Sequence, residues 1–190
     1  RDFCLSRGLG DVYKRQLSIR LNVLSKPNKL YYLEGDHLNL EGLVVQYINN
    51  GSRINIDGYT TIPENDAILS RSDKYIKISY QIPDTNDVIT EIIPIEVIYP
   101  VALNVEVVQK DVIQRSDDPI DLDEAVLSLS YNNGYKEFFY GTSFGTNNIH
   151  TNLSNSRYIH LGKLYIEFEY TRGNETFKAY KAIKLANYTG

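Results

Sequence analysis

Residues 38–51 read LNLEGLVVQYINNG, a run rich in β-branched and apolar residues that ends in an Asn-Gly pair. Such runs favour strands, and Asn-Gly accepts the positive φ angles of a tight hairpin turn. The stretch therefore predicts a short strand over 38–40, a longer one over 43–48, a turn at Asn49, Asn50 and Gly51, and a returning strand over 53–56.

Further strand patterns flank this hairpin in the first half of the chain. Residues 19–24 are expected to form an opening strand. Residues 75–80 alternate apolar and polar side chains, as a half-buried strand does. Residues 91–99 are expected to close the unit, with Pro94 at an edge or bulge because proline cannot donate to a central ladder.

The second half repeats this plan. Its expected strands are 103–108, 120–122, 126–131, 136–140, 163–170 and 176–185, with turns at Asn132, Asn133 and Gly134 and at Gly173 and Asn174. The strand over 164–170 is expected to lie at a sheet edge, where the charges of Lys163, Glu167, Glu169 and Arg172 would prevent intermolecular pairing. Many short strands with turn signals at this spacing are typical of β-sandwiches, and the repetition indicates internal duplication. The predicted fold is therefore all-β, with two tandem immunoglobulin-like β-sandwich domains over 17–99 and 100–190. Pro100 predicts a short, stiff joint between them.

Composition narrows the function classes. Hydrophobic residues make up 42% of the chain and charged residues 23%, as in ordinary globular domains. The net charge of −4, with scattered Lys and Arg, argues against nucleic-acid binding. Apolar runs are shorter than a membrane span requires, so no membrane insertion of this fragment is expected. The absence of methionine predicts an internal fragment of a longer protein.

The first sixteen residues are interpreted as foreign to the natural protein. Residues 6–16 read SRGLGDVYKRQ, which resembles one translated frame of a common transposase sequencing adapter. We expect residues 1–16 to be a disordered, adapter-derived segment that takes no part in the fold. Because Cys4 lies within it, the authentic chain is expected to contain no cysteine.

The first half carries a recognisable motif. Residues 32–45 follow the pattern Y-x-x-G-D-x-L-x-L-x-G-L-x-V, and Tyr47 with Asn50-Gly51 continues it. This resembles the bacterial Ig-like domain family, group 3, over residues 19–99. The match is looser over 101–186, where Glu124-Ala125 replaces the Gly-Leu pair.

The resemblance implies a two-sheet module of extracellular or cell-wall-attached bacterial proteins, without catalytic or cofactor residues. The leading hypothesis is a non-catalytic structural, spacer or adhesion module at the bacterial cell surface. Its expected partners are neighbouring domains of the parent protein, and a cell-wall or host glycan or a host protein is a further candidate.

One acidic cluster is the only candidate for a metal. Asp117, Asp118, Asp121 and Asp123, followed by Glu124, are hard oxygen ligands of the kind Ca²⁺ prefers, but they lack EF-hand spacing. The alternative is a solvated loop in which Asp118-Pro119 starts a turn. The three histidines, His37, His150 and His160, lack zinc-type spacing and are expected to be solvated or capping residues.

Tyrosines of the second half supply the candidate ligand site. Tyr131, Tyr135 and Tyr140 could stack on sugar rings if they are exposed. The alternative function is therefore a carbohydrate-binding accessory module of a secreted glycan-degrading enzyme. The favoured interpretation of these tyrosines is that they are sandwich-face and turn residues. A third hypothesis gives the loop over 141–155 a contact with a host protein.

Overall fold

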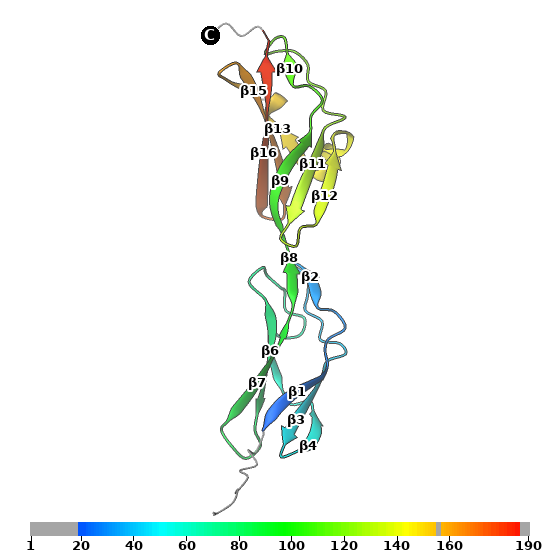
Figure 1. Ribbon diagram of the computed structural model, residues 1–190, viewed down its shortest axis with the longest axis vertical. Helices are drawn as coiled ribbons and strands as arrows, with labels where there is room; N and C mark the ends of the chain where they lie inside the picture. Colours follow the sequence, from blue (N-terminus) through cyan, green and yellow to red (C-terminus); the bar gives the residue numbers. More distant parts are fainter. Residues whose placement is uncertain (1–18, 155–156, 187–190) are drawn as a thin grey trace, which may run out of the picture. The chain divides into compact units, whose positions relative to one another are not determined.

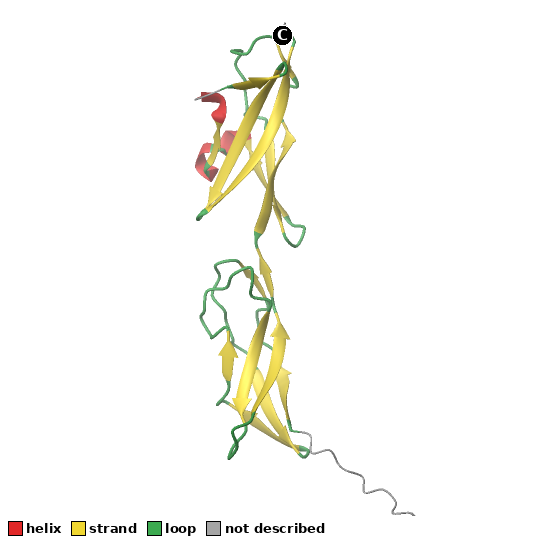
Figure 2. Cartoon of the chain, turned by 90° about the vertical axis from the view of Figure 1, so that its left-hand side faces the viewer, coloured by secondary structure: helices red, strands yellow, loops and turns green. Residues whose placement is uncertain are grey.

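The computed structural model describes residues 19–154 and 157–186, so the adapter-like segment and Cys4 lie outside the described residues. The chain divides into two compact units, Arg1–Val97 (the first unit) and Ile98–Gly190 (the second unit). Within the described ranges the protein is all-β, with several antiparallel sheets and three single-turn 3-10 helices (Figures 1 and 2).

Strands of the first unit form three small sheets. Their bounds are β1 (Arg20–Ser25), β2 (Tyr31–Leu33), β3 (Val44–Asn49), β4 (Ser52–Ile56), β5 (Thr60–Ile62), β6 (Tyr75–Gln81), β7 (Val88–Pro94) and β8 (Glu96–Ile98). The sheet orders are β1-β3-β4, β5-β6-β7 and β2-β8. The β3–β4 hairpin turns at Asn50 and Gly51, both with positive φ, as the Asn-Gly pair predicts.

The first-unit core lies between these sheets. Leu21 on β1 and Val45 on β3 belong to the same buried cluster as Ile76 and Ile78 on β6 and Ile93 on β7. Alternate positions of each strand therefore face a shared interior. Pro94 ends β7, which is the last strand in its sheet order, in agreement with an edge position.

The strand predicted over 38–40 is wrong. Leu38 is buried in the core, but it lies in an irregular segment that is tied to a second loop. The Leu38 N–H donates to the Ala67 carbonyl and the Leu38 carbonyl accepts from the Asp66 N–H. The apolar side chains of residues 38–40 are thus explained by packing of this segment against another loop, and not by a place in a β-sheet. The strand predicted over 120–122 is also absent, and Ile120 and Leu122 pack on the second core from a loop.

The second unit has a similar inventory. Its elements are β9 (Pro100–Val107), β10 (Val112–Ile113), β11 (Val126–Tyr131), β12 (Lys136–Tyr140), η1 (Gly141–Ser143), η2 (Gly145–Asn147), β13 (Ile149–Thr151), η3 (Asn152–Ser154), β14 (Tyr158–His160), β15 (Lys163–Arg172) and β16 (Glu175–Leu185). The sheet orders are β12-β11-β9 and β10-β16-β15-β13, with β14 also paired to β15. One buried cluster draws residues from both sheets.

The two units share a plan. In each, an opening strand and a returning strand flank the middle strand that leads into an Asn-Asn-Gly turn, giving β1-β3-β4 and β9-β11-β12. The second sheets also correspond, since the β6–β7 and β15–β16 hairpins are antiparallel pairs of long strands. This agreement supports the internal duplication inferred from the sequence.

The chain enters each unit at one end and leaves it at the other (Figure 1). In the second unit, the chain enters at Pro100, which pairs with Tyr131 beside the Asn-Asn-Gly turn. It leaves at Leu185, whose backbone N–H donates to the Gly162 carbonyl at the other end of the unit, where β15 begins. In the first unit, Arg20 pairs with Ile48 beside the equivalent turn, and β7 runs away from that end into β8.

Candidate functional site

The acidic cluster closes turns rather than converging on one point. The Asp118 carboxylate accepts hydrogen bonds from the backbone N–H groups of Gln114 and Arg115, both at 2.9 Å. Asp117 forms an ion pair with Arg115, and Asp121 accepts from the Asp123 N–H. Over residues 19–154 and 157–186, no group of three or more His, Cys, Asp or Glu side chains is placed to hold a metal ion.

The predicted tyrosine platform is only partly exposed. Tyr135 and Tyr140 face solvent, but Tyr131 is 6% exposed and belongs to the second-unit core, so its expected exposure is wrong. Its hydroxyl donates to Glu137 Oε2 at 2.7 Å and accepts from Arg172. Burial, followed by the Glu137 hydrogen bond, raises the pKa of Tyr131 to about 12. Tyr131 therefore has a structural role.

The loop proposed to contact a host protein is partly folded onto the core. Residues 141–147 form η1 and η2, and the Phe144 side chain between them is buried edge-on against Phe168, with ring centroids 6.0 Å apart. Residues 149–151 then form β13 on the second sheet, and η3 follows. Asn155, at the end of this loop, lies outside the described residues.

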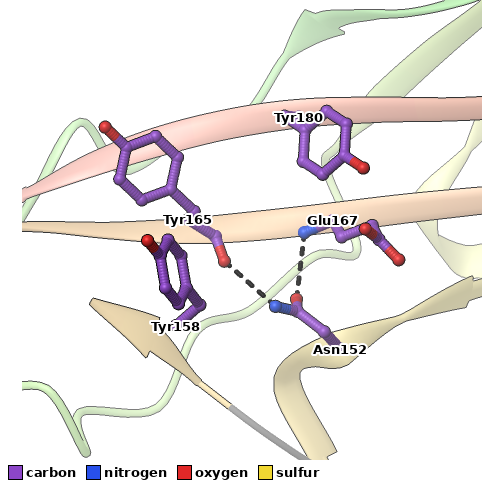
Figure 3. Close-up of a pocket in the computed structure, with 5 residues that line it drawn as sticks. All are labelled: Asn152, Tyr158, Tyr165, Glu167 and Tyr180. Carbon is purple, nitrogen blue, oxygen red and sulfur yellow. Dashed lines mark hydrogen bonds between the residues drawn. The ribbon is translucent and has the colours of Figure 1, made fainter. Parts of the chain in front are cut away.

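A tyrosine-lined hollow lies on the outer face of the second sheet of the second unit. It has a volume of about 450 Å³, and Figure 3 shows the five residues that line it, which are Asn152, Tyr158, Tyr165, Glu167 and Tyr180. We call it the tyrosine hollow. Its residues come from η3, β14, β15 and β16, so the pairing of these elements builds it.

Strand register places the rings on one face. Leu164, Ile166 and Phe168 of β15 point into the core, so the intervening Tyr165 and Glu167 point outward. Across the ladders, Tyr158 is opposite Tyr165, and Tyr180 is opposite Glu167. Tyr165 has the small Ala182 as its partner on β16, which leaves open space beside its ring.

Asn152 fixes the floor of the tyrosine hollow. Its side-chain amide donates to the Tyr165 carbonyl at 3.1 Å and accepts from the Glu167 N–H at 2.9 Å, as the dashed lines in Figure 3 show. The side chain thus satisfies β15 backbone groups in the gap between β13 and β14, where a neighbouring strand would otherwise be needed. This contact holds the surrounding segments at a defined distance from β15.

Aromatic contacts extend across the hollow. The Tyr158 and Tyr165 rings are tilted, with centroids 5.8 Å apart, and His160 lies nearly parallel to Tyr158 at 6.3 Å. Tyr158 and Tyr180 are largely exposed, whereas Tyr165 is half-buried. His160 therefore extends an aromatic surface. His37 lies elsewhere and donates from Nδ1 to the Asp66 carbonyl oxygen at 2.8 Å, and His150 is exposed.

Glu167 is the charged group of the hollow. Its carboxylate accepts a hydrogen bond from Lys178 Nζ at 2.9 Å, and this contact, together with the Tyr180 hydroxyl, holds the pKa of Glu167 below its ordinary value. The same Glu167 contact raises the pKa of Tyr180. Lys178 also pairs with Glu169 at 3.0 Å, and the pKa of Lys178 is raised by these two carboxylates. Two carboxylates therefore share one lysine at this site.

Sequence reasoning missed the tyrosine hollow because it took residues 164–170 for a long edge strand whose charges prevent intermolecular pairing. That interpretation is wrong, since β15 pairs with β16 on one side and with β13 and β14 on the other. Glu167 and Glu169 instead pair with Lys178 across a central ladder. The signal that could have found the site is the outward alternation of Tyr165 and Glu167 opposite Tyr180.

No protein-family model matches the chain, and no curated protein is significantly similar to it. In the part of the chain that the structure describes, no helix has the length and hydropathy needed to span a membrane.

Proposed function

We propose that the chain is a tandem pair of immunoglobulin-like β-sandwich modules that serves as a non-catalytic spacer, display or adhesion segment of a bacterial cell-surface or cell-wall protein. The observation that carries this proposal is the path of the chain. In each unit it enters at one end of the sheets and leaves at the other.

The sandwich assignment is supported by how the cores are built. In each unit the buried cluster combines residues of a three-stranded sheet with residues of a second sheet, and the strands bury alternate positions. The matching strand orders and the group 3 motif over residues 32–45 point in the same direction.

A spacer must keep its attachment points apart under load. A ten-residue strand such as β15 spans roughly 33 Å, because strands rise about 3.3 Å per residue. Modules with attachment points at opposite ends add such spans when they are joined in series. The expected partners are therefore the neighbouring domains of the parent protein, and a surface glycan or host protein where the segment acts in adhesion.

Side-chain chemistry is consistent with a mechanical role. The carboxylates of the acidic cluster close turns, and the Glu34 carboxylate clamps two loops of the first unit through Arg71, with contacts of 2.6 and 2.8 Å. These carboxylates therefore stabilise turns and loops of the fold. The proposal therefore includes no cofactor and no catalytic step.

Single-molecule pulling of the full chain from its two ends tests this function. We expect two separate unfolding events, one for each unit, and each should release roughly 250 Å of chain, from about 3.5 Å per residue less the folded length. A single event that releases both units together, or smooth extension without a force peak, would contradict the proposal.

A further inference from the structure

We propose that the tyrosine hollow is a binding site for a neutral glycan chain. This inference concerns Tyr158, Tyr165, Tyr180 and Glu167 of the second unit, and it does not depend on the spacing role of the two units. It replaces the sugar platform predicted from Tyr131, Tyr135 and Tyr140, whose first ring is buried.

Ring exposure is the first argument. Tyr158 is 58% exposed and Tyr180 is 59% exposed, and both emerge from the same outer sheet face as Tyr165. Aromatic faces bind the C–H faces of sugar rings because the apolar area is removed from water while the hydroxyls stay wet. Rings on three adjacent strands can contact successive sugars of an extended chain.

Polar groups beside the rings supply the second argument. Glu167 offers carboxylate oxygens next to the Tyr180 ring, and the tyrosine hydroxyls both donate and accept hydrogen bonds. A sugar presents hydroxyls around an apolar ring face, so it needs this combination of stacking surface and flanking acceptors. Hydrogen bonds to an ionised carboxylate are stronger than those to neutral groups.

The ion pairing of Glu167 helps to distinguish between a sugar and a cation as the ligand of the hollow. An aromatic site for a quaternary ammonium group would use an unpaired carboxylate and rings that surround one point. Here the Glu167 carboxylate is already ion-paired with Lys178 at 2.9 Å, and Lys178 is shared with Glu169 at 3.0 Å. The ring contact within the hollow joins Tyr158 to Tyr165 on one side of it. The rings thus line an open face rather than a cage, and the carboxylate beside them is already ion-paired, which favours a ligand that binds through ring faces and hydroxyls over a cation.

The site is held in place before any ligand arrives. Asn152 binds the β15 backbone on both sides of Ile166, and Tyr158 and Tyr180 stand on strands paired to β15. Little ordering is therefore required on binding, which reduces its entropic cost.

The test is an NMR titration of the full chain with soluble cello-, chito-, xylo- and mannan-derived oligosaccharides. We expect at least one of these neutral chains to shift the amide signals of Tyr165 and Glu167 and to give saturation transfer from the tyrosine rings. Tetramethylammonium and a proline-rich peptide serve as comparison probes for an aromatic cation site and for a peptide groove.

Variants locate the site. Tyr158→Ala and Tyr180→Ala should each weaken oligosaccharide binding by roughly two- to tenfold, and the double variant should abolish it. Tyr135→Ala and Tyr140→Ala are matched controls, because these side chains are 60% and 58% exposed in the same unit but lie outside the hollow. Glu167→Gln keeps the shape, and we expect it to weaken binding by removing the ionised acceptor.

Tyr180→Phe separates loss of the ring from loss of folding. It retains the aromatic ring, so it should keep most of the affinity for the oligosaccharide. Unchanged thermal unfolding of each variant confirms that the unit is intact. The proposal is overturned if none of the oligosaccharides shifts Tyr165 or Glu167, if tetramethylammonium or the peptide binds there instead, or if the control substitutions weaken binding as much as Tyr158→Ala. Failure here leaves the two unfolding events of the pulling experiment unaffected, so the two proposals fail separately.

Discussion

Tyr32 is a fully buried hydroxyl that joins two loops of the first unit. It is 1% exposed, donates to the Lys29 carbonyl at 2.9 Å and accepts from the Asn39 N–H at 3.3 Å. Tyr32→Phe leaves these backbone groups without their partner, so we expect the free energy of unfolding of the first unit to fall by about 1–2 kcal/mol. Urea unfolding measures this loss.

The neighbouring tyrosine provides the control for that substitution. Tyr31 is on the same strand but is 66% exposed. Tyr31→Phe should change the unfolding free energy by less than about 0.5 kcal/mol. Equal effects of the two substitutions would show that the Tyr32 hydroxyl does not hold these loops.

Glu34 gives the first unit an acid-sensitive contact. Hydrogen bonds from Arg71 lower the pKa of Glu34 below its ordinary value of 4.5, in opposition to burial. A lowered folded-state pKa adds stability that is present above the unfolded pKa and is lost as the pH falls through the folded value. We therefore expect Glu34→Gln to make the decline in melting temperature between about pH 6 and about pH 3 shallower.

Glu64→Gln is the matched control, since Glu64 is an exposed carboxylate on a loop of the same unit. It should leave the acid dependence close to that of the unmodified chain. If Glu34→Gln leaves the dependence equally unchanged, the Glu34–Arg71 contact is not linked to stability. Asp36, whose pKa is lowered chiefly by Lys29, continues to supply acid sensitivity in both variants.

Sequence reasoning at single positions succeeded where local chemistry decides. Gly51 and Gly134 have the positive φ angles that the two Asn-Asn-Gly turns require. At Tyr131 the favoured interpretation, a sandwich-face residue, is confirmed, because a period of two from Leu127 and Leu129 places Tyr131 on the same inward face. The sugar platform, kept as the alternative at this position, is wrong for Tyr131 because the ring is buried.

The join between β12 and η1 requires glycine at position 141. A Cβ at Gly141 would lie 1.6 Å from the Leu122 carbonyl oxygen, so backbone would have to move. We expect Gly141→Ala to lower the unfolding free energy of the second unit by about 1–3 kcal/mol or more. Gly145→Ala, four residues on, has nothing within 4 Å of its Cβ and should be tolerated. Thermal unfolding of the two variants tests this, and equal stability would contradict the close approach.

Long alternating strands were predictable, and short ones were not. Residues 126–131 and 136–140 coincide with β11 and β12, because a period of two and a turn signal define them locally. Three-residue strands such as β2, β5, β13 and β14 carry too few residues to show a period. They exist because a partner strand lies beside them, which is tertiary information.

At the scale of the whole molecule, the repeated plan was predictable and the tyrosine hollow was not. The two Asn-Asn-Gly turns mark equivalent hairpins in both units. The hollow instead depends on the register of three strands and on Asn152. The Asn152 side chain donates to the carbonyl of Tyr165 on β15, which is thirteen residues further along the chain. A sequence shows where apolar and polar residues alternate along one strand. Which strand pairs with which, and in what register, is decided only when the sheets pack.

The central claim is that each unit carries its own core and folds independently. The most direct test compares the amide NMR spectra of residues 17–99, residues 98–190 and the full chain. The account predicts that each isolated unit gives a dispersed β-type spectrum whose signals coincide with those of the full chain, apart from residues near position 98. Collapsed, undispersed signals from either isolated unit would contradict it.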